Sequence, residues 1–169
     1  MRWHDPAELL DRSIDLASSD YDLKKKYDFR QIRIIHEYEH DLPLIPCESG
    51  KIQQLFLNIL RNGAEAMQAL MKKDKTKKPC FILRLMHEQD TGLIRIEIND
   101  NGTGMDAKTR KRVFEPFFTT KPTDCGTGLG LSVSYFIITE NHRGRMSVES
   151  EPDQGTNFII HLPVENKQP

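Results

Sequence analysis

Apolar residues recur at helical spacing in three stretches of the chain. From Ser49 to Lys72 they fall three or four positions apart, the pattern of a helix with one buried face. A shorter stretch runs from Asp5 to Ser19, where Asp5 is a suitable N-cap and Pro6 suits the first helical position. The same spacing predicts a third helix from about Gly128 to Asn141.

Other stretches alternate apolar and polar residues, which is typical of strands. Asp90-Thr91-Gly92 separates two of them as a turn and predicts a hairpin. The predicted strands are Phe29 to Tyr38, Phe81 to Glu88, Leu93 to Asn99, Met146 to Ser150 and Phe158 to Leu162, with a short extended piece from Leu42 to Cys47. This order of elements predicts an α/β (α+β) fold, a two-layer sandwich in which helices cover a mixed, mostly antiparallel sheet.

Composition adds limits on partners and location. A chain of 169 residues is long enough for one domain with a proper core, and its net charge of -1 indicates no nucleic-acid or anionic-lipid partner. Cys47, Cys80 and Cys125 are odd in number and lack C-x-x-C spacing, which favours free thiols in a reducing compartment. The chain has no run of about 18 apolar residues and no signal-peptide pattern, so we expect a cytosolic chain without direct membrane contact.

A polar ridge borders the apolar stripe of the long helix. At 100° per residue, Asn58, Asn62 and Glu65 fall within about 60° of one another. Each asparagine amide has four hydrogen-bonding positions to satisfy, so the ridge is either solvent-facing or part of a site.

Two glycine-rich segments are candidates for ligand contact. Asp100-Asn101-Gly102-Thr103-Gly104-Met105 follows a predicted strand, and its glycines permit a sharp turn or a close approach to a ligand. Gly126-Thr127-Gly128-Leu129-Gly130-Leu131 leads into a helix, where free N–H groups can converge on phosphate. Each alone is also compatible with an ordinary turn. Neither the dinucleotide G-x-G-x-x-G fingerprint nor a G-x-x-x-x-G-K-[ST] loop is present.

Together these segments resemble the ATPase superfamily of gyrase, Hsp90, sensor histidine kinases and MutL. Gln54 to Met67 resembles its asparagine box, and Asp100 to Met105 and Gly126 to Leu131 resemble its two glycine boxes. Arg112 to Lys121 is similar to the phenylalanine box of the histidine kinase branch, and Gly155-Thr156 to the closing G-T. The resemblance extends from about Pro43 to Pro163 and implies a Bergerat-type ATP-binding fold.

This resemblance implies a site for ATP and Mg²⁺. Asn62 would give a side-chain oxygen to Mg²⁺, and Asp100 would accept from the adenine amino group, helped by the Thr156 hydroxyl. Lys121 would be a mobile cation that reaches the phosphates. The implied nucleotide-binding residues are Asn58, Asn62, Asp100, Gly102, Gly104, Lys121, Gly126, Thr127, Gly128, Leu129, Gly130 and Thr156.

The resemblance further implies a reaction that this chain does not complete by itself. Asn58 stands where gyrase-like members carry a glutamate that activates water, and an amide cannot act as a general base. No catalytic residue is therefore clear within this chain. Two departures from the family pattern, Gly63 in place of alanine and His142-Arg143-Gly144 in place of His-Gly-Gly, are expected to leave the ligand contacts untouched.

His36-Glu37 invites two other interpretations. His36-Glu37-Tyr38-Glu39-His40 matches a zinc-binding H-E-x-x-H, but residues four apart on a strand lie about 13 Å from each other, too far to share one ion. It also resembles a phospho-acceptor motif, yet the sequence before Gln54 is too short for a helical hairpin. We therefore expect the acceptor histidine to lie outside this chain.

The resulting hypothesis is the catalytic domain of a two-component sensor histidine kinase. It would donate the γ-phosphate of ATP to a histidine on a separate dimerisation domain, with a response regulator downstream. Residues 1–20 would be a linker helix, 21–165 the ATPase domain and 166–169 a frayed tail. The resemblance implies a cytoplasmic location, either free or as part of a membrane-bound sensor. A stand-alone ATP-binding regulator and an anti-sigma-like serine kinase are the alternatives.

Overall fold

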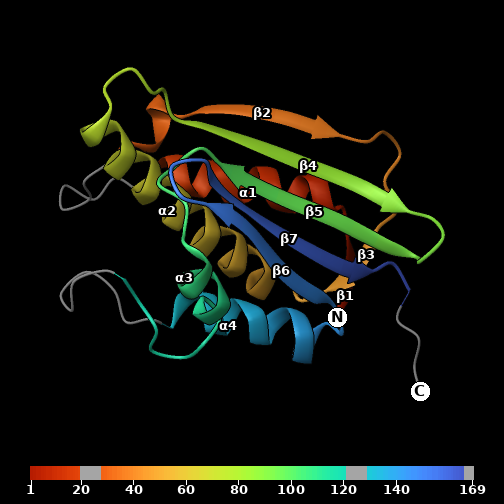
Figure 1. Ribbon diagram of the computed structural model, residues 1–169. Helices are drawn as coiled ribbons and strands as arrows, with labels where there is room; N and C mark the ends of the chain where they lie inside the picture. The colour runs from red at the N-terminus through yellow and green to blue at the C-terminus, as the bar shows by residue number, and fades with distance from the viewer. Residues whose placement is uncertain (20–27, 121–128, 166–169) are drawn as a thin grey trace.

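A computed structural model describes residues 1–19, 28–120 and 129–165 of the chain (Figure 1). The strands are β1 Arg2–His4, β2 Arg33–Tyr38, β3 Ile45–Cys47, β4 Cys80–Glu88, β5 Leu93–Asp100, β6 Arg145–Glu151 and β7 Gly155–Pro163. The helices are α1 Pro6–Ser19, α2 Ser49–Lys73, α3 Ala107–Arg112 and α4 Gly130–Phe136, with a 3-10 turn η1 at Phe29–Gln31 and a π-helical turn η2 at Ile137–Asn141.

Five strands form one sheet in the order β2-β4-β5-β7-β6. Only β2 and β4 run parallel, and the chain between them passes through β3 and α2, so that α2 is the helical crossover of the parallel pair. The other neighbours are antiparallel, and β4 and β5 form the predicted hairpin. The mixed, mostly antiparallel sheet expected from the alternating patterns is confirmed.

One face of this sheet packs against α1 and α2, as Figure 1 shows. Alternate residues of β4, β5 and β7 point toward the helices, because successive side chains of a strand alternate between its faces. The strands contribute Phe81, Leu83, Leu85, Ile94, Ile96, Ile98, Phe158, Ile160 and Leu162 to the core, and the helices contribute Leu9, Leu10, Ile52, Leu55, Phe56, Ile59, Leu60 and Met67. This core fixes α2 against that face of the sheet.

The structure corrects several local expectations. Residues Phe29–Gln31, expected in a strand, form the turn η1, because the Asp28 carboxylate accepts the Arg30 N–H and caps it. The polar helix α3 and the three-residue strand β1 carry no periodic apolar pattern and were not expected. The third predicted helix runs from Gly130 as α4 and ends in the wider turn η2.

His142 fixes the end of η2 against the start of α2. Its Nε2 accepts the Glu48 N–H at 3.1 Å, and its Nδ1 lies 2.7 Å from the Ile137 carbonyl oxygen. Arg143, which replaces the more frequent glycine, has a φ of 54°. That left-handed conformation favours glycine, and Arg143 adopts it directly after the buried His142.

Within the described residues, no helix is long and apolar enough to cross a membrane.

Candidate functional site

Four residues on four neighbouring strands form a row across one end of the sheet. Phe81 is the Cα partner of Asp100, Asp100 of Thr156, and Thr156 of Ser150. Directly opposed residues of antiparallel strands project from the same face. The row therefore brings Asp100 and Thr156, which lie 56 positions apart in the sequence, side by side on the face that packs against α2.

Asp100 is a carboxyl group with little access to water. It is only 4% exposed, and desolvation by burial raises its pKa from the usual 3.8 to about 7. Hydrogen bonds from the backbone N–H groups of Gly102 and Thr156 oppose this rise, and the Gly102 bond measures 2.9 Å. A buried carboxyl group that retains acceptor capacity is suited to an N–H donor on a ligand.

Gly63 brings α2 into contact with Asp100. A Cβ atom at Gly63 would lie 2.6 Å from Cε1 of Phe81 and 3.2 Å from Cβ of Asp100. Gly63 therefore lies against Asp100, one of the proposed ligand contacts, and this corrects the expectation that it touches none of them. Glycine permits the asparagine helix to approach the Asp100 row more closely than alanine would.

Gly102 and Gly104 hold the loop after β5 tightly against the rest of the domain. A Cβ at Gly102 would meet the backbone of Ala66 on α2 at 2.7 Å. Gly104 has a φ of +65°, and its Cβ would lie 1.9 Å from the Glu151 carbonyl oxygen. These glycines are required by close backbone packing, whether or not a ligand is bound.

Asn58 and Asn62 lie half-buried on α2, one turn apart. Nδ2 of Asn58 donates to the Gly130 carbonyl oxygen at 3.3 Å and to Ser134 Oγ at 3.4 Å. The predicted polar ridge thus faces the first turn of α4 rather than open solvent at Asn58. Leu129 is the N-cap residue of α4, and Gly130 begins the helix.

Part of the predicted site falls outside the described residues, namely Lys121, Gly126, Thr127 and Gly128. The phenylalanine box is described up to Thr120. Its Phe114 stacks on Tyr135 of α4 with ring centroids 4.9 Å apart and lies edge-on to Phe158 of β7. The box therefore joins α4 to the sheet beside the Asp100 row.

Ser150 is a site residue that the sequence patterns did not indicate. Its hydroxyl lies 2.8 Å from Thr156 Oγ1, accepts the Met105 N–H at 2.8 Å, and donates to the Gly155 carbonyl oxygen at 3.0 Å. A single serine in a strand carries no motif, so only the register of β6 against β7 identifies it.

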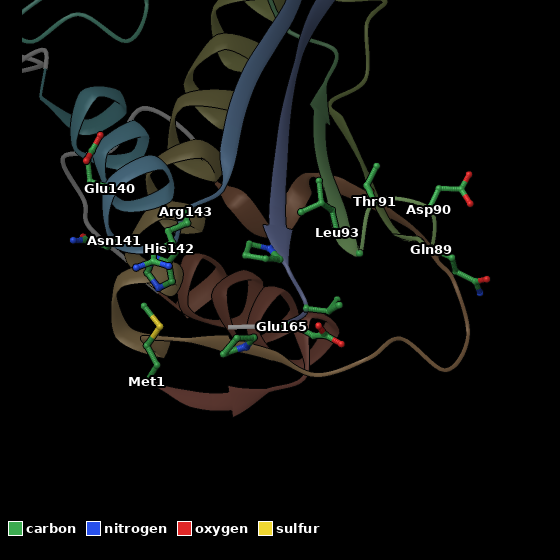
Figure 2. Close-up of a pocket in the computed structure, with 14 residues that line it drawn as sticks. Met1, Gln89, Asp90, Thr91, Leu93, Glu140, Asn141, His142, Arg143 and Glu165 are labelled. Atoms are coloured by element: carbon green, nitrogen blue, oxygen red, sulfur yellow. The ribbon is translucent and has the colours of Figure 1, made fainter. Parts of the chain in front are cut away.

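A separate hollow of about 1130 Å³ opens at the opposite end of the sheet, at the β4–β5 turn (Figure 2). It lies between residues 89–93, the end of η2 and residues 163–165. Its lining includes none of the predicted site residues that the structure describes. The candidate site is instead the Asp100 end.

The His36 segment forms no metal site in the described part of the chain. His36 lies on β2, and its Nε2 is 3.6 Å from Oδ1 of Asp11 on α1. Among the described residues, no group of three His, Cys, Asp or Glu side chains could hold a metal ion.

Comparison with known proteins identifies the class of this domain. Residues 47–166 match the model of the histidine kinase-, DNA gyrase B- and HSP90-like ATPase family, and the chain belongs to that family. More narrowly, it is a catalytic ATP-binding domain of the histidine kinase type, as the phenylalanine box predicted.

Named relatives support this narrower assignment. The chain is 44% identical over 124 residues to sporulation kinase E of Bacillus subtilis, covering 73% of this chain and 15% of that protein. The catalytic domain of histidine kinase ThkA matches with a TM-score of 0.76 at 23% identity, over 97% of this chain and 99% of that one. Full-length ShkA in complex with AMPPNP matches with a TM-score of 0.74 at 25% identity, over 96% of this chain and 30% of that one. The chain therefore spans a small part of sporulation kinase E and of full-length ShkA.

Proposed function

We propose that this domain binds Mg-ATP and donates its γ-phosphoryl group to a histidine on a separate dimerisation domain. The observation that carries the proposal is the pairing of Asp100 with Thr156 directly beneath the asparagine helix α2. This pairing brings together the first glycine box, the closing G-T and the asparagine box at one end of the sheet. The complex of the similar ShkA with AMPPNP adds support for an adenine nucleotide as the ligand.

The base would be held at the Asp100 row. The Asp100 carboxylate accepts from an exocyclic amino group, whereas a carbonyl at that position would leave the buried carboxylate facing another acceptor. Gly102 and Gly104 keep the loop after β5 close to this position. The row thus favours adenine over guanine.

The triphosphate and Mg²⁺ would be held between α2 and α4. The amide oxygen of Asn62 is a hard ligand of the type that Mg²⁺ takes, and Asn58 lies one turn away, beside the first residue of α4. Bound Mg²⁺ would neutralise charge on the phosphate oxygens. Lys121, Gly126, Thr127, Gly128, Leu129 and Gly130 are the remaining proposed phosphate contacts, as in the family pattern.

The proposed transfer needs an acceptor from outside this chain. A donor site for phosphoryl transfer requires position and charge neutralisation more than a covalent catalyst, and Asn58 cannot deprotonate water. Residues 1–20 would connect the domain to its dimerisation partner, with 21–165 as the ATPase domain and a response regulator as the downstream acceptor. The α1 part of that connection packs on α2, so it would be anchored to the asparagine helix. We propose a cytoplasmic location for this assembly.

Transfer of label tests the proposal. The chain is incubated with γ-labelled ATP, Mg²⁺ and a helical hairpin that carries a phospho-acceptor histidine, and the same hairpin with histidine replaced by glutamine is the control. Acid-labile label on the histidine hairpin alone is the expected result. Acid-stable label would instead indicate a serine kinase, and ATP binding without transfer to any acceptor hairpin would indicate a nucleotide sensor. Either outcome would overturn the proposal.

A further inference from the structure

Ser150 lies at the centre of a closed set of hydrogen bonds. The residue is 5% exposed, and its hydroxyl has three partners, the Met105 N–H, the Gly155 carbonyl oxygen and the Thr156 hydroxyl. A serine hydroxyl offers one proton and two lone pairs, so three partners saturate it.

The chemistry of these partners fixes the direction of each hydrogen bond. The Met105 N–H can only donate, so it occupies one lone pair of Ser150. The Gly155 carbonyl oxygen can only accept, so it takes the Ser150 proton. Thr156 must then donate its own proton to the second lone pair of Ser150.

Thr156 is therefore left with lone pairs alone to offer a ligand. Its neighbour in the row, Asp100, is an acceptor whenever it is ionised. Two adjacent acceptors are the complement of an amino group, which has two N–H donors. They oppose a carbonyl oxygen, which has none.

We propose that Ser150 is a specificity-determining residue that orients the Thr156 hydroxyl proton and so makes the base-recognition row selective for a 6-amino purine over a 6-oxo purine. The inference rests on the proposed function, because it takes an adenine nucleotide as the ligand of the Asp100 row. Ser150 acts through Thr156 and is thus a positioning residue.

The surroundings of Ser150 hold this arrangement in place. Arg110 of α3 donates from Nη1 to the Ser150 carbonyl oxygen at 2.9 Å, and the Asp153 N–H donates to the Thr103 carbonyl oxygen at 2.6 Å. The first bond fastens α3 to β6, and the second fastens the loop after β5 to the β6–β7 turn. Burial of Ser150 and Thr156, which is only 7% exposed, limits exchange of partners with water.

The test compares ATP with inosine triphosphate, which replaces the 6-amino group with a 6-oxo group. In Ser150→Ala, the Thr156 proton is released and can donate to the 6-oxo group. The ratio of the Kd for inosine triphosphate to the Kd for ATP should fall roughly fivefold, the factor of about one neutral hydrogen bond. Ser147→Ala, an exposed serine on the same strand, should leave the ratio unchanged.

A double-mutant cycle separates this effect from general loosening. In a Thr156→Val background, Ser150→Ala should not change the ratio, because no hydroxyl proton remains to redirect. If Ser150→Ala does not fold, Ser150→Cys replaces it, since a thiol sulfur of similar size is a poor acceptor of the Thr156 proton and should lower the ratio in the same direction.

Two outcomes overturn the inference. One is an unchanged ratio in a folded Ser150 variant, and the other is a change in ratio that persists in the Thr156→Val background. If the wild-type chain binds neither nucleotide, the proposed function itself fails. That result is distinguishable from the other two because it appears before any substitution is made.

Discussion

Gly63 of α2 packs directly against Asp100 of β5, with space for no further atom between the helix backbone and the sheet. A Cβ at Gly63 would lie within 3.2 Å of the Asp100 Cβ and nearer still to the Phe81 ring. The helix that carries Asn58 and Asn62 is therefore set at its distance from Asp100 by a missing side chain. Position 63 controls the geometry of the site although it has no functional group of its own.

Gly63→Ala is expected to destabilise the domain although alanine is the better helix former. The gain in propensity is about 1 kcal/mol, whereas an added methyl in a packed interface costs about 1–3 kcal/mol and displaces a fully buried Phe81 ring. Urea denaturation measures the difference. Gly50→Ala, in the same helix with no atom within 4 Å of the new Cβ, should be neutral or stabilising.

A second substitution checks the cause. Gly63→Ala should cost less stability in a Phe81→Leu background than in the wild-type chain, because the smaller side chain gives room to the methyl group. A Gly63→Ala domain as stable as the wild type would contradict the close packing described for this position.

Asp100→Asn is expected to stabilise the empty domain at high pH while weakening ATP binding. Burial raises the pKa of Asp100 to about 7, so between about pH 4 and 7 the folded state binds more protons than the unfolded state. Wild-type stability should therefore fall as pH rises through this window, by roughly 4 kcal/mol in total for a shift of about three pKa units. Asp100→Asn has no ionisable group at this position, so its stability should not fall in this pH window.

Thermal unfolding at pH 4.5 and pH 8 measures the effect, together with ATP binding at pH 8. The Tm of the variant should exceed that of the wild type at pH 8 and approach it at pH 4.5. ATP affinity should fall because an amide nitrogen replaces one acceptor. Equal Tm values at pH 8 would mean that the Asp100 charge carries no cost in the folded domain.

Gly104→Ala and Gly92→Ala form a matched pair. Both glycines have nearly the same positive φ, +65° and +66°, so alanine meets a similar backbone cost of about 1 kcal/mol at each. Only at Gly104 would the new Cβ meet the Glu151 carbonyl oxygen. We expect Gly92→Ala to cost only stability, and Gly104→Ala to displace the loop after β5 and lower ATP affinity at least tenfold.

Calorimetric titration with ATP distinguishes the two variants. If both bind ATP equally well, the contact of Gly104 with the β6–β7 turn has no part in shaping the site.

Asn62→Ala is expected to weaken ATP binding in Mg²⁺ and to leave binding in EDTA nearly unchanged. An amide oxygen that contacts the metal contributes only when the metal is present. Gln54→Ala, an exposed amide on the same helix, is the control and should affect neither condition. Equal losses with and without Mg²⁺ would place Asn62 on the nucleotide rather than on the metal.

Sequence patterns predicted the elements whose apolar faces are long. The 25 residues of α2 repeat their apolar positions over many turns, and the β4–β5 hairpin combines alternation with an Asp-Thr-Gly turn. Helix α3 was not predicted because Ala107–Arg112 buries no residue and so shows no apolar pattern. Its start is set instead by the Asp106 carboxylate, which accepts the Thr109 N–H. Strand β1 is three residues long, too short to show a period.

The site residues likewise divide into those that local patterns indicate and those that only contacts between distant segments reveal. Asp100 and the glycines could be named because they form local motifs, and the structure then places Asp100 beside Thr156 in the sheet and Asn58 against α4. Ser150 and Gly63 could not be assigned roles, since theirs depend on which residues face them across strands and across the helix–sheet interface. The residues of one segment do not show which residues of another strand will lie opposite them.

The parallel pairing of β2 with β4 has a consequence for how this domain tolerates change. Because α2 is the connection between these two strands, its path is closed at both ends by the sheet itself, and it cannot slide without unpairing an edge strand. We therefore expect insertions and deletions to be tolerated in the turns on either side of the crossover and not within α2. Among domains with this topology, we expect the length of the turns that flank α2 to vary, while the position of α2 on the sheet stays the same.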